Sequence, residues 1–288
     1  MSASTPILPA AFDIVDAQLH LSLDMPGEKI LAAMDTLGIR GVIVDEFWGI
    51  NPARQGTPCA SFADGAHRPL SPYAQAAALL HPQRVAYLQR VDRRDPQLAC
   101  LIPVLATSPG CRALRIVLLE AAERQAFAAG GYDQVLTLAQ EHGLPVCVMG
   151  VDTGALPQAA TRHPDLTFVL DHCGWPRSPQ HWDEILQLAR LSNVYMKWSH
   201  ALRAFGRAAD PGAAVQREFL RAIDAFGARR VLWASDATHE ESGATLEQLL
   251  SFVRDNPALA PDDKAWVLGG AARQVFGWEA PAAAAAQG

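Results

Sequence analysis

Short apolar runs recur along the chain, and most of them end in a polar or charged residue. Runs that are this short and continuous are typical of parallel strands buried on both faces. Eight such runs can be counted: Phe12–Ala17, Gly41–Val44, Arg84–Val91, Ala113–Val117, Leu144–Val148, Thr167–Leu170, Val194–Trp198 and Val231–Ser235.

Longer segments with helical spacing of apolar residues separate these runs. The clearest are Gly27–Leu37, Gln134–His142, Ala155–Arg162, His181–Leu191, Ala213–Phe226, Leu246–Asp255 and Asp262–Phe276. Gly38, Gly143 and Gly227 follow three of them, as expected where a helix ends with a positive φ. Eight strand–helix units joined by right-handed crossovers close a barrel. The sequence therefore predicts an α/β fold, a (β/α)₈ barrel in one domain over residues 1–278, in preference to two small domains.

Two segments fall outside this alternation. The stretch from Trp48 to Pro72 is rich in Gly, Pro, Ser and Asn, and it is predicted to be a long loop over the mouth of the barrel that sets specificity. Residues 279–288 form an alanine-rich tail that lacks the larger apolar groups of a core and is predicted to be disordered.

Composition narrows the classes of partner. The formal net charge is -6 and no basic face is concentrated anywhere, which argues against a nucleic-acid partner but not against a small anionic substrate. No stretch approaches the roughly 18 apolar residues of a membrane span, and no leader pattern precedes the fold, so a cytoplasmic protein is expected. The five cysteines include no CxxC pair and are expected to be reduced and structural. Whether the chain forms a homo-oligomer is left open.

Candidate chemistry lies where apolar strands break. The first strand leads into Asp16-Ala-Gln18-Leu-His20, in which Gln18 and His20 point to the same side. The sixth leads into Asp171-His172-Cys-Gly-Trp-Pro, and the eighth into Ser235-Asp236-Ala-Thr-His239. Side chains at the carboxyl ends of barrel strands converge on one mouth, so these groups are expected to meet.

These three segments resemble the signature strands of the amidohydrolase-related TIM-barrel family, which includes 2-pyrone-4,6-dicarboxylate and sugar-acid lactonases. They are similar to its Asp-x-His-x-His, Asp-His-x-Gly-x-Pro and Gly-Ser-Asp-x-Pro-His motifs. Weaker similarities occur at His81–Arg84, Arg112–Arg115, Asn193–Ser199 and Gly269–Arg273. The resemblance spans about Asp13 to Trp278. It implies a barrel enzyme that acts on a small cyclic ester.

Two departures from the family pattern bear on metal binding. Gln18 stands where the family commonly has a first-strand histidine, and the fifth strand ends in Val-Cys147-Val-Met149-Gly without a ligand. A zinc site generally needs three or four N, O or S ligands. We therefore expect no metal cofactor, as the resemblance allows, with one zinc on His20, His172 and Asp236 as the alternative.

Without a metal, ester hydrolysis requires a base for water and donors for the oxyanion. Asp236 is the candidate base, with a pKa raised by partial burial. His20 and His172 would polarise the carbonyl or protonate the leaving oxygen, and Gln18 would donate its amide to the same carbonyl. The alternative is structural: Asp236 could cap a helix or pair with an arginine, and both histidines could belong to the core.

Further residues are candidates for substrate binding. Arg115 could bind a carboxylate through two parallel hydrogen bonds, although a structural ion pair within the barrel explains it equally well. The remaining candidates are Lys197, Ser199, His200, His239, Glu46 and Trp48. Trp175 is expected to be a packing residue.

The leading hypothesis is thus a hydrolase that opens a small carboxylated or hydroxylated lactone without a metal. A lactone isomerase would use nearly the same groups. The same residues are also compatible with a zinc-dependent amidohydrolase or decarboxylase, and with a non-catalytic barrel that binds a metabolite.

Overall fold

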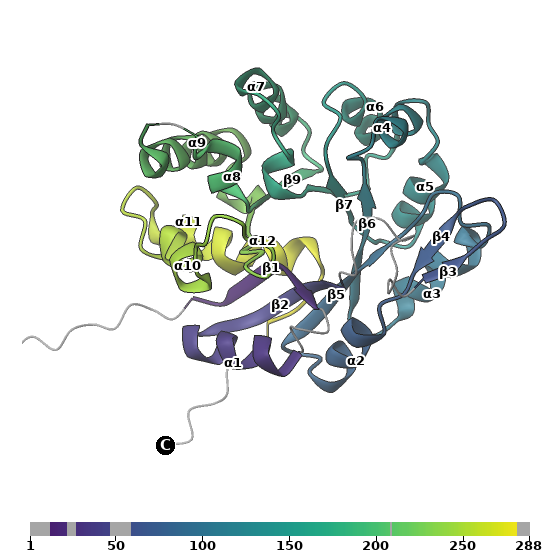
Figure 1. Cartoon of the computed structure of the whole chain (residues 1–288), viewed down its shortest axis with the longest axis horizontal. Coiled ribbons are helices and arrows are strands. Elements are labelled where there is room, and N and C mark those ends of the chain that lie inside the picture. The colour runs from purple at the N-terminus through teal and green to yellow at the C-terminus, as the bar shows by residue number, and fades with distance from the viewer. Residues whose placement is uncertain (1–11, 22–26, 47–58, 208, 281–288) are drawn as a thin grey trace, which may run out of the picture.

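The computed structural model describes residues 12–21, 27–46, 59–207 and 209–280. Eight parallel strands form a barrel in the order β1-β2-β5-β6-β7-β8-β9-β10 (Figure 1). Their bounds are β1 Ile14–Leu21, β2 Ile39–Glu46, β5 Val85–Arg90, β6 Cys111–Val117, β7 Val146–Met149, β8 Phe168–Leu170, β9 Val194–Trp198 and β10 Val231–Trp233. The amide of Asp236 donates to the carbonyl of Gln18 at 2.9 Å, which links the segment after β10 to β1. All eight predicted runs overlap these strands, and the single-domain (β/α)₈ barrel is confirmed.

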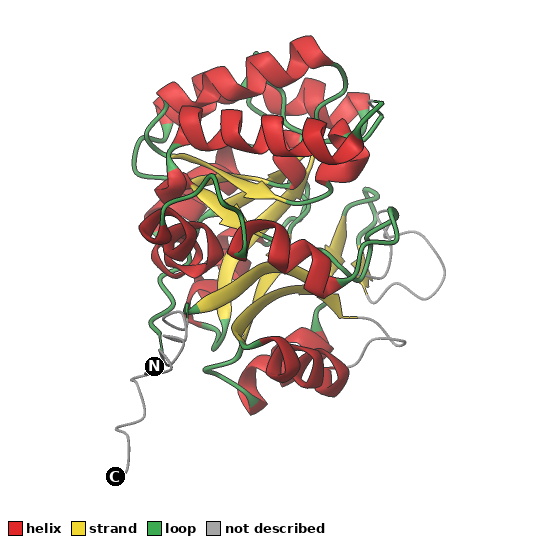
Figure 2. Ribbon diagram, turned by 90° about the vertical axis from the view of Figure 1, so that its left-hand side faces the viewer, coloured by secondary structure: helices red, strands yellow, loops and turns green. Residues whose placement is uncertain are grey.

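Helices surround the barrel (Figure 2). They are α1 Gly27–Leu37, α2 Pro72–Leu80, α3 Leu98–Thr107, α4 Ala121–Ala128, α5 Asp133–Glu141, α6 Leu156–Arg162, α7 Pro179–Gln187, α8 Ala201–Phe205, α9 Pro211–Phe226, α10 Leu246–Arg254, α11 Pro261–Ala265 and α12 Ala271–Val275. The predicted helix at 262–276 is present, but a π-helical turn at Trp266–Gly270 separates α11 from α12. No helix in the described ranges has the length and apolar content needed to cross a bilayer.

Part of the segment predicted as one long loop forms regular secondary structure. It contains an antiparallel hairpin of β3 (Cys59–Ser61) and β4 (His67–Pro69), and α2 begins at Pro72. The prediction of a structureless loop is therefore wrong for this part, because a three-residue strand pair gives no readable period. Trp48 and the rest of 47–58 lie outside the described residues, as does most of the predicted tail (281–288).

The barrel interior has two layers. Small and branched apolar side chains fill one layer, among them Val15, Ile43, Leu88, Val169 and Leu232. Two residues further along several strands, the inward positions become polar: Asp45 follows Ile43, Arg115 follows Ala113, and Asp171 follows Val169. The carboxyl ends of the strands thus surround a buried polar layer.

An irregularity in β1 determines which of its side chains enter this layer. The pairing register with β2 shifts between Asp16 and Leu19. Ala17 packs in the interior layer, whereas Leu19 and Leu21 pack against the surrounding helices. A bulge that changes the phase of alternation re-aims side chains. Here it turns Gln18 and His20 inward together, as the sequence predicted for the pair.

One glycine allows the C-terminal helices to approach the barrel closely. A Cβ at Gly269 would lie 1.8 Å from the carbonyl oxygen of Asp13. No side chain fits there, which explains glycine in the π-helical turn. The predicted helix-ending glycines Gly38, Gly143 and Gly227 all have positive φ.

Candidate active site

Asp236 lies at the centre of a cluster of histidines at the mouth of the barrel. His20 Nε2 is 3.1 Å from Asp236 Oδ1, and His200 Nε2 is 2.9 Å from Oδ2. His172 Nδ1 is 3.6 Å from Oδ2, and the His239 ring lies 4.4 Å from that of His20. The three groups from strands one, six and eight therefore meet, as the sequence predicted.

The backbone is strained at this cluster. His172, His200 and Asp236 have φ of 52°, 51° and 47°, and Cys173 and Trp175, which flank the first of them, also have positive φ. No other non-glycine residue in the described ranges has positive φ. Such conformations cost on the order of 1–3 kcal/mol each and concentrate at functional sites. The strain therefore points to this cluster as the functional site.

Neighbouring groups fix the orientation of His172. Ser199 Oγ is 2.9 Å from its Nδ1, and Arg115 Nη2 is 3.3 Å from its Nε2. Because a guanidinium can only donate, Nε2 must accept and Nδ1 carries the hydrogen. Burial lowers the pKa of His172 to about 3, despite the nearby carboxylates, so the ring is neutral.

His20 is fixed differently. Its Nδ1 lies 3.0 Å from the backbone carbonyl of Asp45, which can only accept, so Nδ1 carries a hydrogen. Its Nε2 then faces Asp236 Oδ1, another acceptor. A proton or a metal cation between these two atoms would remove the repulsion between the facing lone pairs.

Asp236 has a lowered pKa, not the raised one that we expected. Burial alone would raise the pKa, but the interactions with His20, His200 and His172 outweigh burial and hold it well below its usual range. The expectation was wrong because sequence alone could not reveal that three imidazoles surround the carboxylate. Burial also lowers the pKa of His239, to about 4.

Arg115 belongs to a buried ion-pair network below the cluster. Its Nε donates to Asp171 Oδ2 at 2.7 Å, and its Nη1 donates to Asp45 Oδ2. Arg90 Nη2 also donates to Asp45 at 2.7 Å, and Lys197 Nζ lies 2.9 Å from Asp171 Oδ1. The guanidinium is 1% exposed and cannot meet a substrate. We expected Arg115 to recognise substrate. The structure shows instead the buried structural ion pair that the sequence left open as the alternative.

Gln18 and Lys197 lie beneath the site. Lys197 Nζ donates to Gln18 Oε1 at 2.7 Å, and Gln18 Nε2 is 3.3 Å from His20 Nε2. Both side chains are fully buried. The amide therefore supports His20 and the ion-pair network and is not directed at a bound carbonyl, contrary to our expectation.

The remaining candidates take different positions. Ser199 and His200 reach the cluster. Glu46 is buried, and its Oε2 accepts from the amide of Ala74 in the first turn of α2, so it stabilises that helix terminus. Cys173 is buried, which raises its pKa to about 12, in keeping with a structural thiol.

A small pocket of about 290 Å³ opens beside the cluster. His172 and His200 line it, together with three arginines that we did not predict: Arg177, Arg203 and Arg207. Trp175 lies under the Arg203 guanidinium at 4.7 Å, so it is part of the mouth and not simply a packing residue. These arginines follow strands six and seven by several residues and match no motif, although three arginines close after the strand ends could have served as a signal.

Asp16 joins β1 to the segment after β10. Its carboxyl accepts from the Ser235 amide at 2.8 Å and from the Ser235 hydroxyl. Burial raises the pKa of Asp16 from 3.8 to about 7, because the hydrogen bonds from Ser235 and Gln18 offset burial only in part.

Asp16→Asn should become more stable relative to the wild type as pH rises from 4 to 7. In that window the unfolded chain has lost the Asp16 proton while the folded chain retains it, so the wild type loses stability with rising pH. At about 1.4 kcal/mol per unit of pKa, the difference reaches a few kcal/mol.

The measurement is the free energy of unfolding in urea at pH 5 and pH 8 for both proteins. His172 and His239 contribute the opposite slope, since their lowered pKa values destabilise the fold as pH falls below about 6.5, but both proteins share it. A difference between the two proteins that stays constant with pH would refute the raised pKa of Asp16.

The cluster offers two sets of ligands that fit a single metal ion. Donor atoms of His20, Asp236 and His239 lie within 4.8 Å of one another, as do those of His172, His200 and Asp236. The first set fits better, because His20 already donates its other nitrogen to a backbone carbonyl, as metal-ligating histidines do. The sequence placed His172 in one ligand set with His20 and Asp236. In the structure its donor atom groups with those of His200 and Asp236, and not with that of His20.

Comparison with known proteins identifies the family. A family model described as "Amidohydrolase" matches residues 72–278, more than half of the chain. No curated protein matches the sequence.

Three solved structures illustrate the similarity. An amidohydrolase from Burkholderia multivorans with bound zinc has a TM-score of 0.73 at 19% identity, covering 92% of this chain and 99% of that one. An Acinetobacter baumannii protein described as a candidate 2-pyrone-4,6-dicarboxylic acid hydrolase, with citric acid bound, has a TM-score of 0.68 at 15% identity, covering 92% and 99%. The 5-carboxyvanillate decarboxylase of Sphingomonas paucimobilis has a TM-score of 0.60 at 16% identity, covering 93% and 99%. The chain belongs to the amidohydrolase family, and its family membership supports a hydrolase.

Proposed function

We propose that this protein hydrolyses a small lactone that carries a carboxylate, by adding water to the ring carbonyl without a metal ion. The observation that carries the proposal is the convergence of His172, His200 and Asp236, each on strained backbone, beside a pocket lined by three arginines. The similarity to a candidate pyrone-dicarboxylate hydrolase supports a lactone as the substrate class.

In this proposal Asp236 and His20 act as one unit. One proton lies between Oδ1 and Nε2; the Asp236 carboxylate takes a second proton from water as the water oxygen bonds to the ring carbonyl carbon, and gives that proton to the ring oxygen as the bond between this carbon and the ring oxygen breaks.

His172 and His200 form one wall of the pocket. Because both nitrogens of His172 are already engaged, the guanidinium groups of Arg203 and Arg207, which also line the pocket, would donate to the carbonyl oxygen as it gains negative charge. Ser199 orients His172.

The ion-pair network below the cluster favours the metal-free version. Arg90 and Arg115 pair with Asp45, and Arg115 and Lys197 pair with Asp171. These two buried carboxylates already have cationic partners from the protein, which leaves fewer ligands for a metal ion.

A zinc-dependent hydrolase is the second candidate. It is favoured by the two facing acceptors, His20 Nε2 and Asp236 Oδ1, between which a cation could lie, and by the bound zinc of the Burkholderia structure. His20, Asp236 and His239 would hold the ion, and the ion would lower the pKa of a bound water.

Metal analysis and product analysis separate the candidates. Purified protein is assayed for zinc, manganese and iron, and then for acid release from carboxylated lactones with and without chelator. Hydrolysis that chelator leaves unchanged supports the metal-free proposal. Stoichiometric metal with activity lost on stripping supports the zinc candidate, an isomeric lactone as product supports an isomerase, and released CO₂ supports a decarboxylase.

We expect Arg177→Gln to raise KM for a carboxylated lactone about tenfold and to change kcat little. A hydrogen bond to a charged group contributes about 1.5–3 kcal/mol, and tenfold corresponds to the lower end of this range. Steady-state kinetics on a carboxylated lactone and its uncharged analogue measure the effect. Arg162→Gln, on the exposed face of α6, is the control. An equal rise in KM for both substrates would contradict recognition of the carboxylate at this pocket.

A further inference from the structure

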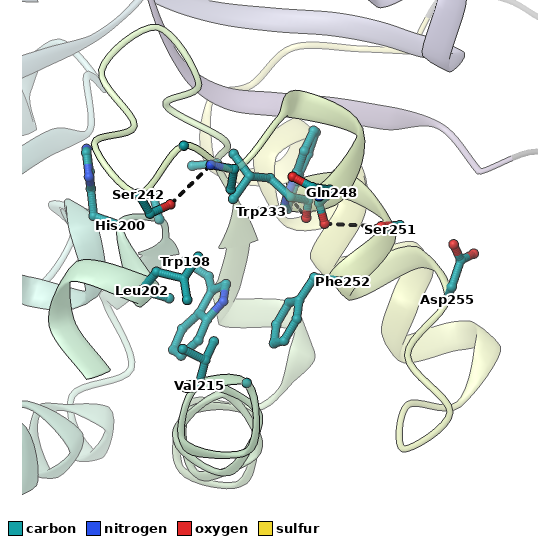
Figure 3. A pocket seen from close by; sticks show the side chains of 17 residues that line it. Trp198, His200, Leu202, Val215, Trp233, Ser242, Gln248, Ser251, Phe252 and Asp255 are labelled. Carbon is teal, nitrogen blue, oxygen red and sulfur yellow. Dashed lines mark hydrogen bonds between the residues drawn. The ribbon is translucent and has the colours of Figure 1, made fainter. Parts of the chain in front are cut away.

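A second and larger pocket, of about 740 Å³, lies between the barrel and its outer helices (Figure 3). The ends of β9 and β10 form one wall, α8 and the start of α9 another, and α10 a third. Trp198, Val215 and Phe252 face the same space from three different elements in the close-up view. Trp233 and Leu202 also line it.

This pocket reaches the catalytic cluster. Ser199 and His200 both line it, and these residues contact His172 and Asp236 respectively. His200 also lines the arginine pocket, whose remaining walls come from the segment after β8 and from α8 and the residues after it. A ligand at the cluster can therefore extend in two directions from His200.

The two directions differ in chemistry. The smaller pocket carries three arginines, whereas the lining of the larger pocket contains no lysine or arginine among the described residues. Among its polar residues, Ser242, Gln248 and Asp255 are exposed, while Trp198, Trp233 and Val215 are buried. Ligand sites typically measure about 300–1,000 Å³ and are lined mostly by apolar and aromatic groups with few polar ones. The larger pocket has this size and this lining.

We propose that the larger pocket binds an uncharged apolar arm, an alkyl or aryl chain, of the lactone that reacts at the cluster. The proposal rests on the proposed function and specifies its substrate class: an amphiphilic lactone with a carboxylate on the arginine side of His200 and an apolar arm on the other. Nothing about the chemistry at Asp236 changes; the arm supplies binding energy and orients the ring.

A series of lactones with alkyl chains of one to eight carbons tests the proposal. Each buried methylene contributes about 0.8 kcal/mol, so kcat/KM should rise about fourfold per carbon until the pocket is filled. A kcat/KM that does not depend on chain length would overturn the proposal.

Val215→Phe fills the pocket from α9 and should lower the ratio of kcat/KM for the longest to the shortest lactone by more than tenfold. Val104→Phe makes the same change at an exposed position on α3 and should leave the ratio unchanged. Leu249→Trp narrows the pocket from α10 and is the second test variant if Val215→Phe does not fold. An unchanged ratio in the folded pocket variants would overturn the proposal.

The corresponding alkyl lactams separate this inference from the proposed function, because they keep the shape of the lactones but resist hydrolysis. Calorimetry should give dissociation constants that fall about fourfold per methylene in the wild type and that depend far less on chain length in Val215→Phe. If no lactone is hydrolysed but the lactams behave in this way, the proposed function fails and the apolar pocket stands. If lactones are hydrolysed but the affinity for lactams does not depend on chain length, the assignment of the larger pocket fails and the proposed function stands.

Discussion

Asp236→Asn is expected to lower kcat/KM for lactone hydrolysis by about 10³–10⁴-fold. A positioned acid–base group typically contributes 10²–10⁴-fold, and an amide at this position can neither accept the proton of water nor share one with His20. The carboxylate also holds His200 Nε2 at 2.9 Å, so the substitution removes the partner that orients this ring. The measurement is steady-state acid release from a carboxylated lactone.

Asp133→Asn is the matched control, because its carboxylate is about half exposed and pairs with Arg162 on the surface. It should retain full activity. Circular dichroism and urea unfolding establish that both variants fold. Retention of more than a tenth of wild-type kcat/KM by a folded Asp236→Asn would remove this carboxylate from the chemistry.

Arg115→Met should destabilise the fold by about 3–5 kcal/mol. The substitution removes one cation from the buried network and leaves the charges of Asp45 and Asp171 incompletely paired, and breaking a buried ion pair from one side has an effect of this size. The free energy of unfolding in urea at pH 7 measures the effect.

Arg162→Met provides the comparison, since the ion pair of Arg162 with Asp133 is exposed and contributes about 0–1 kcal/mol. If Arg115→Met unfolds within 1 kcal/mol of the wild type, the ion-pair network does not hold the polar layer together, and a substrate-binding role for this arginine returns to consideration.

The strands could be predicted because burial on both faces requires a continuous apolar run. Such a run can be recognised without knowing which strand pairs with it. Helix α3 was harder to recognise. Its sequence is apolar from Leu98 to Ala106 and contains Pro103, so it shows no amphipathic period. The hairpin β3–β4 was missed because strands of three residues are too short to alternate visibly.

The site could be predicted only as far as strand ends converge. Motif spacing located His20, His172 and Asp236, but not which atoms face each other. Arg115 and Lys197 both point inward at strand ends, and only the structure shows that acidic partners already occupy them. The inward and outward alternation of side chains along β9 does not continue to His200. The left-handed backbone there turns the His200 side chain toward Asp236, and no periodicity of the sequence predicts this turn.

The arginine pocket and the apolar pocket were missed for a related reason. Both are formed by loops and short helices, in particular α8, whose five residues carry no readable pattern. Their side chains become neighbours only when the loops after β8, β9 and β10 fold over the same mouth.

Metal-free addition of water can be tested by hydrolysis of a carboxylated lactone in H₂¹⁸O by chelator-treated enzyme, with mass spectrometry of the product. We expect one ¹⁸O atom in each newly formed carboxylate, at a rate equal to that of the untreated enzyme. Product without ¹⁸O, or label incorporated only after metal is restored, would contradict it.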